Sequence, residues 1–280
     1  MIRDTSVRAK LWATAVWVLL GFFILNLIAM IATVVTSSFA TRWLGTWLPV
    51  GWTTRWYTSA WDEFQLGDVL TVTFQVVFLV VVLSGVLGVP AAYALARRDF
   101  PGKRLVMLLF LLPLLVPPFT FGIPLATVLY RTGLAGSMSG VVLANLVPTV
   151  PFVILVMIPF IEQIDPRIEA AARVFGANTW RLFAYVLLPL LIPGMLAALL
   201  LVLVRTIAMF ELTFLTAGPT SQTLVVALYY AVFAAGVRAT QSVDAMAMIY
   251  MVTTLVWLVI ALRFVNPTQI VGRAKQEPAH

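Results

Sequence analysis

The chain has 280 residues, of which 62% are hydrophobic and 10% are charged, a composition that excludes an ordinary water-soluble globular domain. It has no cysteine, which excludes disulfides and thiolate metal sites. Its formal net charge of +7 does not indicate nucleic-acid binding, because the basic residues are spread over short loops beside apolar runs; a polytopic, all-α membrane protein is expected instead.

The first predicted element is an apolar run over residues 11–35, which follows a short basic segment, residues 1–10. The run exceeds the ~20 residues that cross the hydrocarbon core of a bilayer. It is also longer than the apolar core of a typical signal peptide, so an uncleaved membrane anchor is expected.

The next stretch, residues 36–67, is polar and rich in tryptophan. Indole rings favour the boundary between water and lipid, where the ring is buried and the N–H stays wet. A belt at the outer membrane surface is therefore expected, and a docking surface for an extracellular partner is the alternative. The tryptophans are Trp43, Trp47, Trp52, Trp56 and Trp61.

Three further spans are expected over residues 69–96, 105–130 and 140–161. Prolines interrupt the last two, and each proline removes a backbone hydrogen bond and bends the helix axis. In lipid the freed carbonyls must be met by neighbouring helices or water, so the span over 105–130 is expected to be buried in the bundle or to line a cavity. The prolines are Pro113, Pro117, Pro118 and Pro124 in the first of these two spans, and Pro148, Pro151 and Pro159 in the second.

A fifth span is expected over residues 189–210 and a sixth over 245–264, whereas the apolar run 223–236 is too short to cross and predicts a half-helix or a helix packed on the outer face. Six spans place both termini on one side of the membrane. Basic residues concentrate in the loops that this topology places in the cytoplasm. Those inside are Arg3, Arg8, Lys10, Arg97, Arg98, Lys103, Arg104, Arg167, Arg173, Arg181, Arg263, Arg273 and Lys275, against Arg42, Arg55, Arg131 and Arg238 outside.

A polar, alanine-rich insert at residues 165–193 separates the fourth span from the fifth. Asp165 and Pro166 form a helix start and Gly176 a stop, and Asn178 can cap a second helix, so a helix-Gly-helix elbow is expected over 165–186. The first helix carries a narrow apolar face with Glu169 off it. This face predicts either docking into a groove of a partner or a helix lying on the bilayer with no partner. It consists of Ile168, Ala171, Ala172 and Phe175.

The elbow resembles the EAA loop of the membrane subunits of binding-protein-dependent ABC importers, usually E-A-A-x-x-x-G-A followed by Ile/Leu-x-Leu-Pro. Ala170 stands at the usual Glu, with Glu169 one position earlier, and Val174 at a frequent Asp. Matching positions are Ala171, Ala172, Gly176, Ala177, Leu188 and Pro189. The resemblance implies that the first elbow helix inserts into a cleft of a cytoplasmic ATPase, with coupling residues Ile168, Glu169, Ala171, Ala172, Phe175, Gly176 and Ala177.

Nearly the whole chain is similar to permease subunits of type I ABC importers, closest to the spermidine/putrescine-type branch. The shared features are the extra N-terminal helix, Trp56-Tyr57, the elbow and a turn over residues 216–219. The resemblance implies a single transmembrane permease domain, residues 11–265, in a bacterial inner membrane, with residues 1–10 and the tail 266–280 cytoplasmic. It also implies two ATPases, an extracytoplasmic substrate-binding protein and a second permease, which the missing elbow acid suggests is a different chain.

No catalytic or metal constellation appears, so a transport subunit rather than an enzyme is expected. Residues around Gly102-Lys103 do not form a phosphate-binding loop, so the chain is expected to bind no cofactor itself and ATP to bind to the partner ATPases. An ion-coupled secondary transporter is the first alternative, although mid-span acids and an internal repeat are not seen. A non-transporting scaffold is the second, although it would have no evident use for proline-broken spans.

Arg205 and Glu211 are ionisable residues within or beside the fifth span, where such groups are costly, and both are expected to line a substrate pathway. Arg205 could instead snorkel outward, and Glu211 could lie at the water boundary. Six positions of separation put them about 120° apart on a helix, so they are not expected to pair. Glu211 and Asp244 favour a cation such as a polyamine, whereas Arg205 argues the other way. A polyamine-like solute is expected, with a sugar or an anionic solute as the alternative. Asp244 itself is expected to cap the sixth span.

Overall fold

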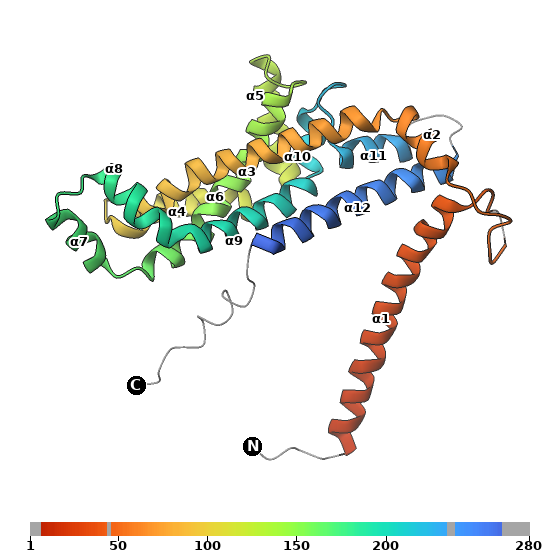
Figure 1. The fold of residues 1–280 in the computed structure, drawn as a ribbon, viewed down its shortest axis with the longest axis horizontal. Helices are drawn as coiled ribbons and strands as arrows, with labels where there is room; N and C mark the ends of the chain where they lie inside the picture. Colours follow the sequence, from red (N-terminus) through yellow and green to blue (C-terminus); the bar gives the residue numbers. More distant parts are fainter. Residues whose placement is uncertain (1–6, 44–45, 234–238, 265–280) are drawn as a thin grey trace. The chain divides into compact units, whose positions relative to one another are not determined.

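The computed structural model describes residues 7–43, 46–233 and 239–264, and most of them are helical (Figure 1). The described residues hold no β-strand, only an isolated bridge between Ala40 and Trp52. The predicted all-α fold is therefore confirmed. The chain forms two compact units, Met1–Gln65 with Ala231–Met251, and Leu66–Tyr230 with Val252–His280.

The core of the larger unit is made by three long helices, α3 (Leu66–Arg97), α6 (Met138–Glu162) and α9 (Leu188–Ile207), which pack against one another (Figure 1). Within lipid, helices associate by close packing rather than by a hydrophobic driving force, so small residues at the contacts are needed. Gly88 of α3 and Gly194 of α9 supply this closeness. A Cβ on Gly88 would lie 2.7 Å from Cγ1 of Val153, and one on Gly194 would lie 2.6 Å from the Phe160 ring.

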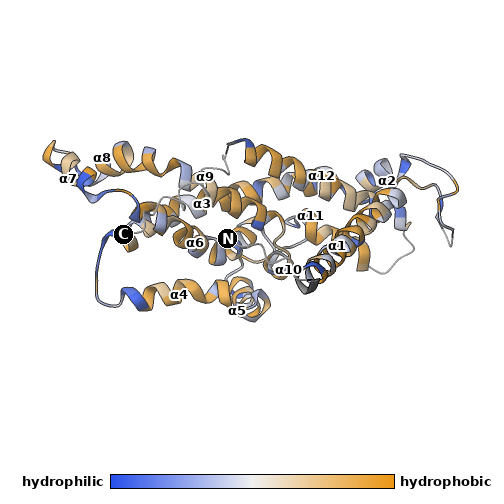
Figure 2. Ribbon diagram, turned by 90° about the horizontal axis from the view of Figure 1, so that it is seen from below, coloured by the Kyte–Doolittle hydropathy of each residue, from blue (hydrophilic) through white to orange (hydrophobic). Residues whose placement is uncertain are grey.

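The described residues contain five helices that are long and apolar enough to cross a membrane, and six spans if one bent pair of helices counts as one. Figure 2 shows hydrophobic residues along α3, α6 and α9 and hydrophilic ones at α7. Each predicted span overlaps one of these segments, with differences in bounds. The segments are Lys10–Phe39, Leu66–Arg97, Met138–Glu162, Thr179–Ile207 and Thr240–Ile260, with Lys103–Leu115 and Pro118–Arg131 as the bent pair.

The third predicted span differs most from expectation. It consists of α4 (Lys103–Leu115) and α5 (Pro118–Arg131), whose axes differ by 102°. Val116 and Pro117 each precede a proline and are extended, with ψ near 136°, because a following proline ring disfavours the helical conformation. Within this chain α4 has no buried residue, whereas α5 buries Gly122, Ala126 and Leu129, so the expectation that the segment is buried in the bundle or lines a cavity stays a prediction for α4.

The fourth predicted span, α6, is not broken by its prolines, and the expected interruptions at Pro148, Pro151 and Pro159 are absent. Side-chain donors support the backbone around Pro148. The Thr149 hydroxyl donates to the carbonyl of Asn145 at 2.8 Å, and the Asn145 amide donates to the carbonyl of Val141 at 2.9 Å. Neither carbonyl is the one that Pro148 leaves without a backbone donor, which is that of Ala144, so these bonds add to the backbone ladder beside the proline.

The fifth span ends earlier than predicted, at Ile207 instead of Phe210, and a short helix α10 (Glu211–Thr216) follows it. Helix α10 contacts α5 and α6, and its Leu212 is fully buried. Helix α11 (Leu224–Phe233) is too short to span, as predicted, and the end of the predicted segment, residues 234–236, lies outside the described residues. The first turn of α11 is attached to α3, because the amide of Leu224 donates to the Thr73 hydroxyl at 2.8 Å.

The smaller unit contains α1 (Val7–Phe39), α2 (Arg55–Glu63) and the first part of α12 (Thr240–Phe264). Helix α2 was not expected from the sequence. Asp244 does not cap α12, because that helix begins at Thr240; the Asp244 carboxylate accepts instead from the Ser37 hydroxyl of α1. Of the predicted N-terminal segment 1–10 only the last four residues are described, and the predicted tail 266–280 lies outside the described residues.

The tryptophan-rich stretch holds both exposed and internally bonded indoles. Trp47 is 99% exposed. Trp56 is held inside the unit, because its indole N–H donates to the Ala40 carbonyl at 2.7 Å. The N–H of Trp43 likewise donates within the chain, to the Thr46 carbonyl at 2.8 Å. These two indoles therefore have structural partners instead of water.

Candidate functional site

The predicted elbow is present, and its caps explain its shape. Helix α7 (Pro166–Val174) begins where the Asp165 side chain accepts from the amide of Arg167 at 2.8 Å. It ends in a Schellman arrangement, in which Gly176 and Ala177 donate backward to the carbonyls of Arg173 and Ala172, at 2.9 and 3.0 Å. Gly176 has φ of +82°, the left-handed conformation that this motif requires.

The second half of the elbow is continuous with the fifth span. Helix α8 (Thr179–Arg181) is capped by Asn178, whose side chain accepts from the amide of Arg181 at 2.8 Å, as predicted. A π-helical segment, η1 (Leu182–Leu187), then leads into α9. The sequence gives no signal for this segment. Wider turns of this type are rare and frequently lie at functional sites.

One face of α7 is apolar and exposed, and we call it the α7 outer face: Ile168, Ala171, Val174 and Phe175. Phe175 is 89% exposed and Val174 85%, whereas Ile168 is 42% exposed. An aromatic side chain with so little cover on a polar helix is unusual and marks a surface for a partner or for lipid. Val174 was not among the predicted site residues, and Ala172, which was, turns inward and packs on the core cluster.

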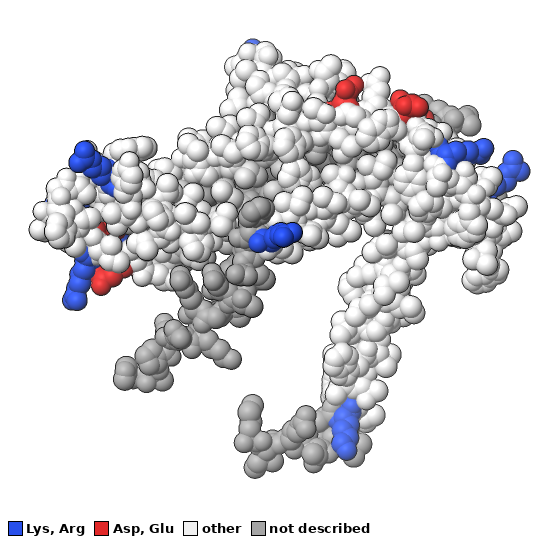
Figure 3. Space-filling view, in the orientation of Figure 1, with Lys and Arg blue, Asp and Glu red and all other residues white. Residues whose placement is uncertain are grey.

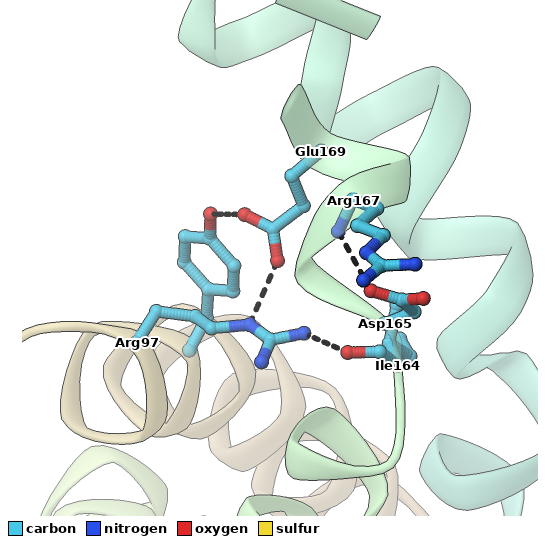
Figure 4. Close-up of polar contacts among 6 residues, drawn as sticks. Arg97, Ile164, Asp165, Arg167 and Glu169 are labelled. Carbon is cyan, nitrogen blue, oxygen red and sulfur yellow. Dashed lines mark hydrogen bonds and ion pairs between the residues drawn. The ribbon is translucent and has the colours of Figure 1, made fainter. Parts of the chain in front are cut away.

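The opposite side of α7 is buried and polar. Glu169 is 7% exposed, and its carboxylate accepts from the Tyr93 hydroxyl at 2.6 Å and from Nε of Arg97 at 2.7 Å (Figure 4). Arg97 also donates to the backbone carbonyl of Ile164, just before α7. The carboxylate of this predicted coupling residue is therefore engaged within the chain, on two residues of α3 that the sequence did not single out.

Charged side chains visible in Figure 3 lie over the α7–α8 end and also around α2, and much of the surface over α3 carries none. Around the α7 outer face Arg167, Arg173 and Arg181 are exposed, beside the exposed acid Asp165 at the start of α7, while Glu169 is buried. An acidic rim on a partner would complement these arginines.

An apolar cavity of about 450 Å³ lies beside the elbow. Tyr93 connects it to the polar side of α7, since its ring lines the cavity and packs edge-on against Phe183, with 5.9 Å between ring centroids. The lining residues are Pro90, Tyr93, Thr179, Trp180, Leu182, Phe183 and Leu187.

The two predicted pathway residues lie on either side of a helix break, at residues 208–210. Arg205 is in the last turn of α9, with Cζ 5.6 Å from the centroid of the Phe152 ring, and Glu211 begins α10. Among the described residues neither makes an ion pair, so they do not pair with each other, as expected. No group of His, Asp and Glu that could hold a metal ion is found in the described part of the chain.

The sequence and the fold of this chain are similar to those of known transport proteins. The family described as "Binding-protein-dependent transport system inner membrane component" matches residues 84–269. The chain is 30% identical, over 67% of its length, to the diacetylchitobiose uptake system permease protein NgcG of Streptomyces coelicolor, and 36% identical, over 51% of its length, to the molybdenum transport system permease protein ModB of Haemophilus influenzae. These matches span 60% of NgcG and 69% of ModB.

The fold is similar to that of a chain in a solved structure, a bacterial ABC transporter involved in the import of the acidic polysaccharide alginate. The two chains superpose with a TM-score of 0.73 at 20% sequence identity, over 99% of this chain and 100% of the other. At this identity the likeness concerns the helical fold, and it includes the extra N-terminal helix within the aligned length.

Proposed function

The chain belongs to the family of binding-protein-dependent transport system inner membrane components, the permease subunits of ABC importers, and from this premise we propose that it forms half of a translocation pathway driven by ATP. It is a multi-pass inner membrane protein and not an enzyme. In the proposed assembly two cytoplasmic ATPases bind ATP, a second permease of different sequence completes the pathway, and an extracytoplasmic binding protein delivers the solute. No cofactor binds to this chain.

The observation that carries the proposal is the α7 outer face. It combines an almost fully exposed Phe175 with a helix that is capped at both ends, so the anchor is presented in a fixed geometry. Preorganised aromatic anchors of this kind dominate helix-in-groove recognition. Exposed arginines around it match an acidic groove rim on an ATPase. The basic bias of the loops supports the same side of the membrane, with both termini in the cytoplasm.

The solute is proposed to be an anion or a sugar. The polyamine expected from the sequence finds no support among the relatives, which carry diacetylchitobiose and molybdenum by their names. Arg205 supports an anion, because a guanidinium without an ion pair near the end of a span offers charge-assisted hydrogen bonds to an oxyanion. A binding screen on the cognate soluble receptor, with sulfate, molybdate, short oligosaccharides and spermidine, tests this. Binding of spermidine alone would contradict it.

A cross-linking experiment tests the coupling role of the α7 outer face. Because the chain has no cysteine, single cysteines can be introduced at Phe175 and Ile168 and labelled with a photoreactive maleimide. We expect both to capture a subunit that mass spectrometry identifies as an ATPase with a phosphate-binding loop. Val86, 63% exposed on α3, provides a matched control that should capture none.

Two results would contradict the proposal. One is that neither elbow cysteine captures such an ATPase while uptake proceeds normally. The other is that the purified chain alone, in liposomes, transports the solute when a proton gradient is applied, which would favour the ion-coupled alternative.

A further inference from the structure

We infer that Glu169 is a positioning residue: its buried carboxylate, held by Tyr93 and Arg97, ties α7 to the cytoplasmic end of α3 so that the two helices move as one body. This inference rests on the proposed function, because motion of α7 matters only if a partner drives it.

Both oxygens of the Glu169 carboxylate accept a hydrogen bond. One oxygen accepts from the Tyr93 hydroxyl at 2.6 Å and the other from Nε of Arg97 at 2.7 Å (Figure 4). The side chains of Arg97 and Glu169 are only 15% and 10% exposed. Hydrogen bonds to an ionised group are stronger than neutral ones, and low exposure limits their weakening by water.

Arg97 holds the elbow at two points. Besides Glu169 in the middle of α7, its guanidinium donates to the Ile164 carbonyl in the linker between α6 and α7. Figure 4 shows the guanidinium between these two acceptors. The entry and the centre of the elbow are therefore fixed to the same residue of α3, which restricts rotation of α7 as well as its distance from α3.

Helix α7 needs such a connection. It has nine residues, and helices of this length are not stable alone in water. Besides the Glu169 bonds, Ala172 packs on the core cluster with a small side chain, and α7 contacts η1. Glu169 and Ala172 are three residues apart and so lie on one side of α7, whereas Glu169 and Phe175 are six residues apart, about 120° around the helix.

The position of the acid in the elbow explains why it points inward. Ala170, where similar loops usually carry the acid, is exposed, whereas Glu169 is buried. One residue corresponds to about 100° around a helix, enough to turn a side chain from the outer surface toward α3. In this chain the acid thus serves the attachment of α7 to its own membrane helices instead of contact with the partner.

Through α3, the attachment of α7 is connected to the core helices. Helix α3 packs along both α6 and α9, and the Tyr93 ring contacts Phe183 of η1. Movement imposed on α7 would therefore be passed to the three helices that make the core, without relative motion at the α3–α7 contact.

Spin labels test the one-body inference in the full chain. Cysteines introduced at Ala94 of α3 and Ala170 of α7, both exposed and the only cysteines present, report the distance between the two helices. Without nucleotide, we expect one narrow distribution in the parent and a second, longer population in E169A. Loss of hydrogen bonds to a charged group shifts the equilibrium between attached and detached α7 by about 10- to 150-fold. Y93F, which removes only one hydroxyl, should give a smaller second population.

The matched control is E162Q, since Glu162 is an exposed acid at the end of α6 outside this network; its distribution should equal the parent's. A distribution in both E169A and Y93F as narrow as that of the parent would overturn the inference. In the parent complex with its ATPases, the Ala94–Ala170 distance should be the same with and without ATP, and a nucleotide-dependent change would also overturn it.

Failure of the proposed function has a different signature. In that case the label distances would still respond to E169A, but the Phe175 cysteine would capture no ATPase. Conversely, the Phe175 cysteine could capture an ATPase while E169A leaves the label distances unchanged. That result would support the importer function and contradict the positioning role of Glu169.

Discussion

Gly176 and Gly88 show two different reasons for a glycine at the scale of a single residue. Gly176 has φ of +82° and open space around it, so a side chain there meets backbone strain only. Gly88 has ordinary helical dihedrals, but an added Cβ would lie 2.7 Å from the Val153 side chain and 3.3 Å from the Val150 carbonyl. The first position is restricted by conformation and the second by packing.

For Gly176, we expect substitution by Ala to cost about 1–2 kcal/mol, the penalty of the left-handed conformation, and Asn to cost less. The measurements are thermal unfolding of the purified chain and cross-linking from Phe175. Gly102 is a matched control, because it has φ of +88° and also nothing within 4 Å, but lies outside the elbow. G102A should lose similar stability and keep the cross-link. Equal loss of the cross-link in both variants would show that the Gly176 conformation has no specific role in presenting Phe175.

For Gly88, we expect G88A to destabilise the chain by about 1–3 kcal/mol, as overpacking of a tight interface does. The double variant G88A/V153A should recover most of this, because removal of the valine methyl groups creates the space that the new Cβ needs. Gly21 of α1, with nothing within 4 Å, is the control, and G21A should be neutral or slightly stabilising. If V153A fails to rescue G88A, the contact between α3 and α6 is not what limits residue 88.

At the scale of helices, the sequence predicts where elements lie better than how they bend. Apolar length located the spans, and caps such as Asp165 and Asn178 set the ends of the elbow helices, because both signals are local. The presence of prolines alone predicted breaks in both places, but α6 is continuous, whereas the axes of α4 and α5 differ by 102°. The difference is that Pro117 and Pro118 are adjacent, so two successive residues are forced into extended conformations.

The bend itself is testable by distance measurement. Leu105 and Tyr130 are both exposed, and spin labels attached there should be separated by a straight-line distance of roughly 20–25 Å in the bent pair. A straight helix would give about 38 Å at 1.5 Å per residue. Leu143 and Glu162 on α6 form the control pair, which should give about 29 Å, the value for an unbroken helix. Long distances in both pairs would refute the bend, and short distances in both would refute the continuity of α6.

Helix α7 illustrates what the sequence could not supply at this scale. Its apolar stripe was visible in the spacing of Ile168, Ala171 and Phe175, but the partners of Glu169 are 72 and 76 positions away in the chain. No local pattern connects such positions. The inward turn of Ala172 and the π-helical segment are likewise determined by packing against α3 and the core.

At the scale of the whole molecule, fold and family follow from composition and one motif, whereas the solute does not. Under the proposed topology the net charge reflects orientation in the membrane, and the Asp244 carboxylate, which favoured a polyamine in the sequence, accepts from the Ser37 hydroxyl. Within the part of the chain that the structure describes, Arg205 and Glu211 make no ion pair, so substitutions of these two charges can test whether the solute is an anion or a cation.

Paired substitutions at these positions decide between an anionic and a cationic solute. For an anion, R205A should raise KM for uptake by about 10- to 150-fold, the equivalent of one or two charge-assisted hydrogen bonds, while R205K retains part of the affinity. E211Q should then be neutral or favourable, because it removes a repulsive charge. For a polyamine the order reverses, with E211Q the larger loss. Arg131, exposed at the end of α5, provides the control R131A, which should leave KM unchanged. An uncharged sugar would be indicated by small and similar effects of R205A and E211Q, and measurement of uptake by the intact importer at two salt concentrations would separate that case, since screening weakens only the charged interactions.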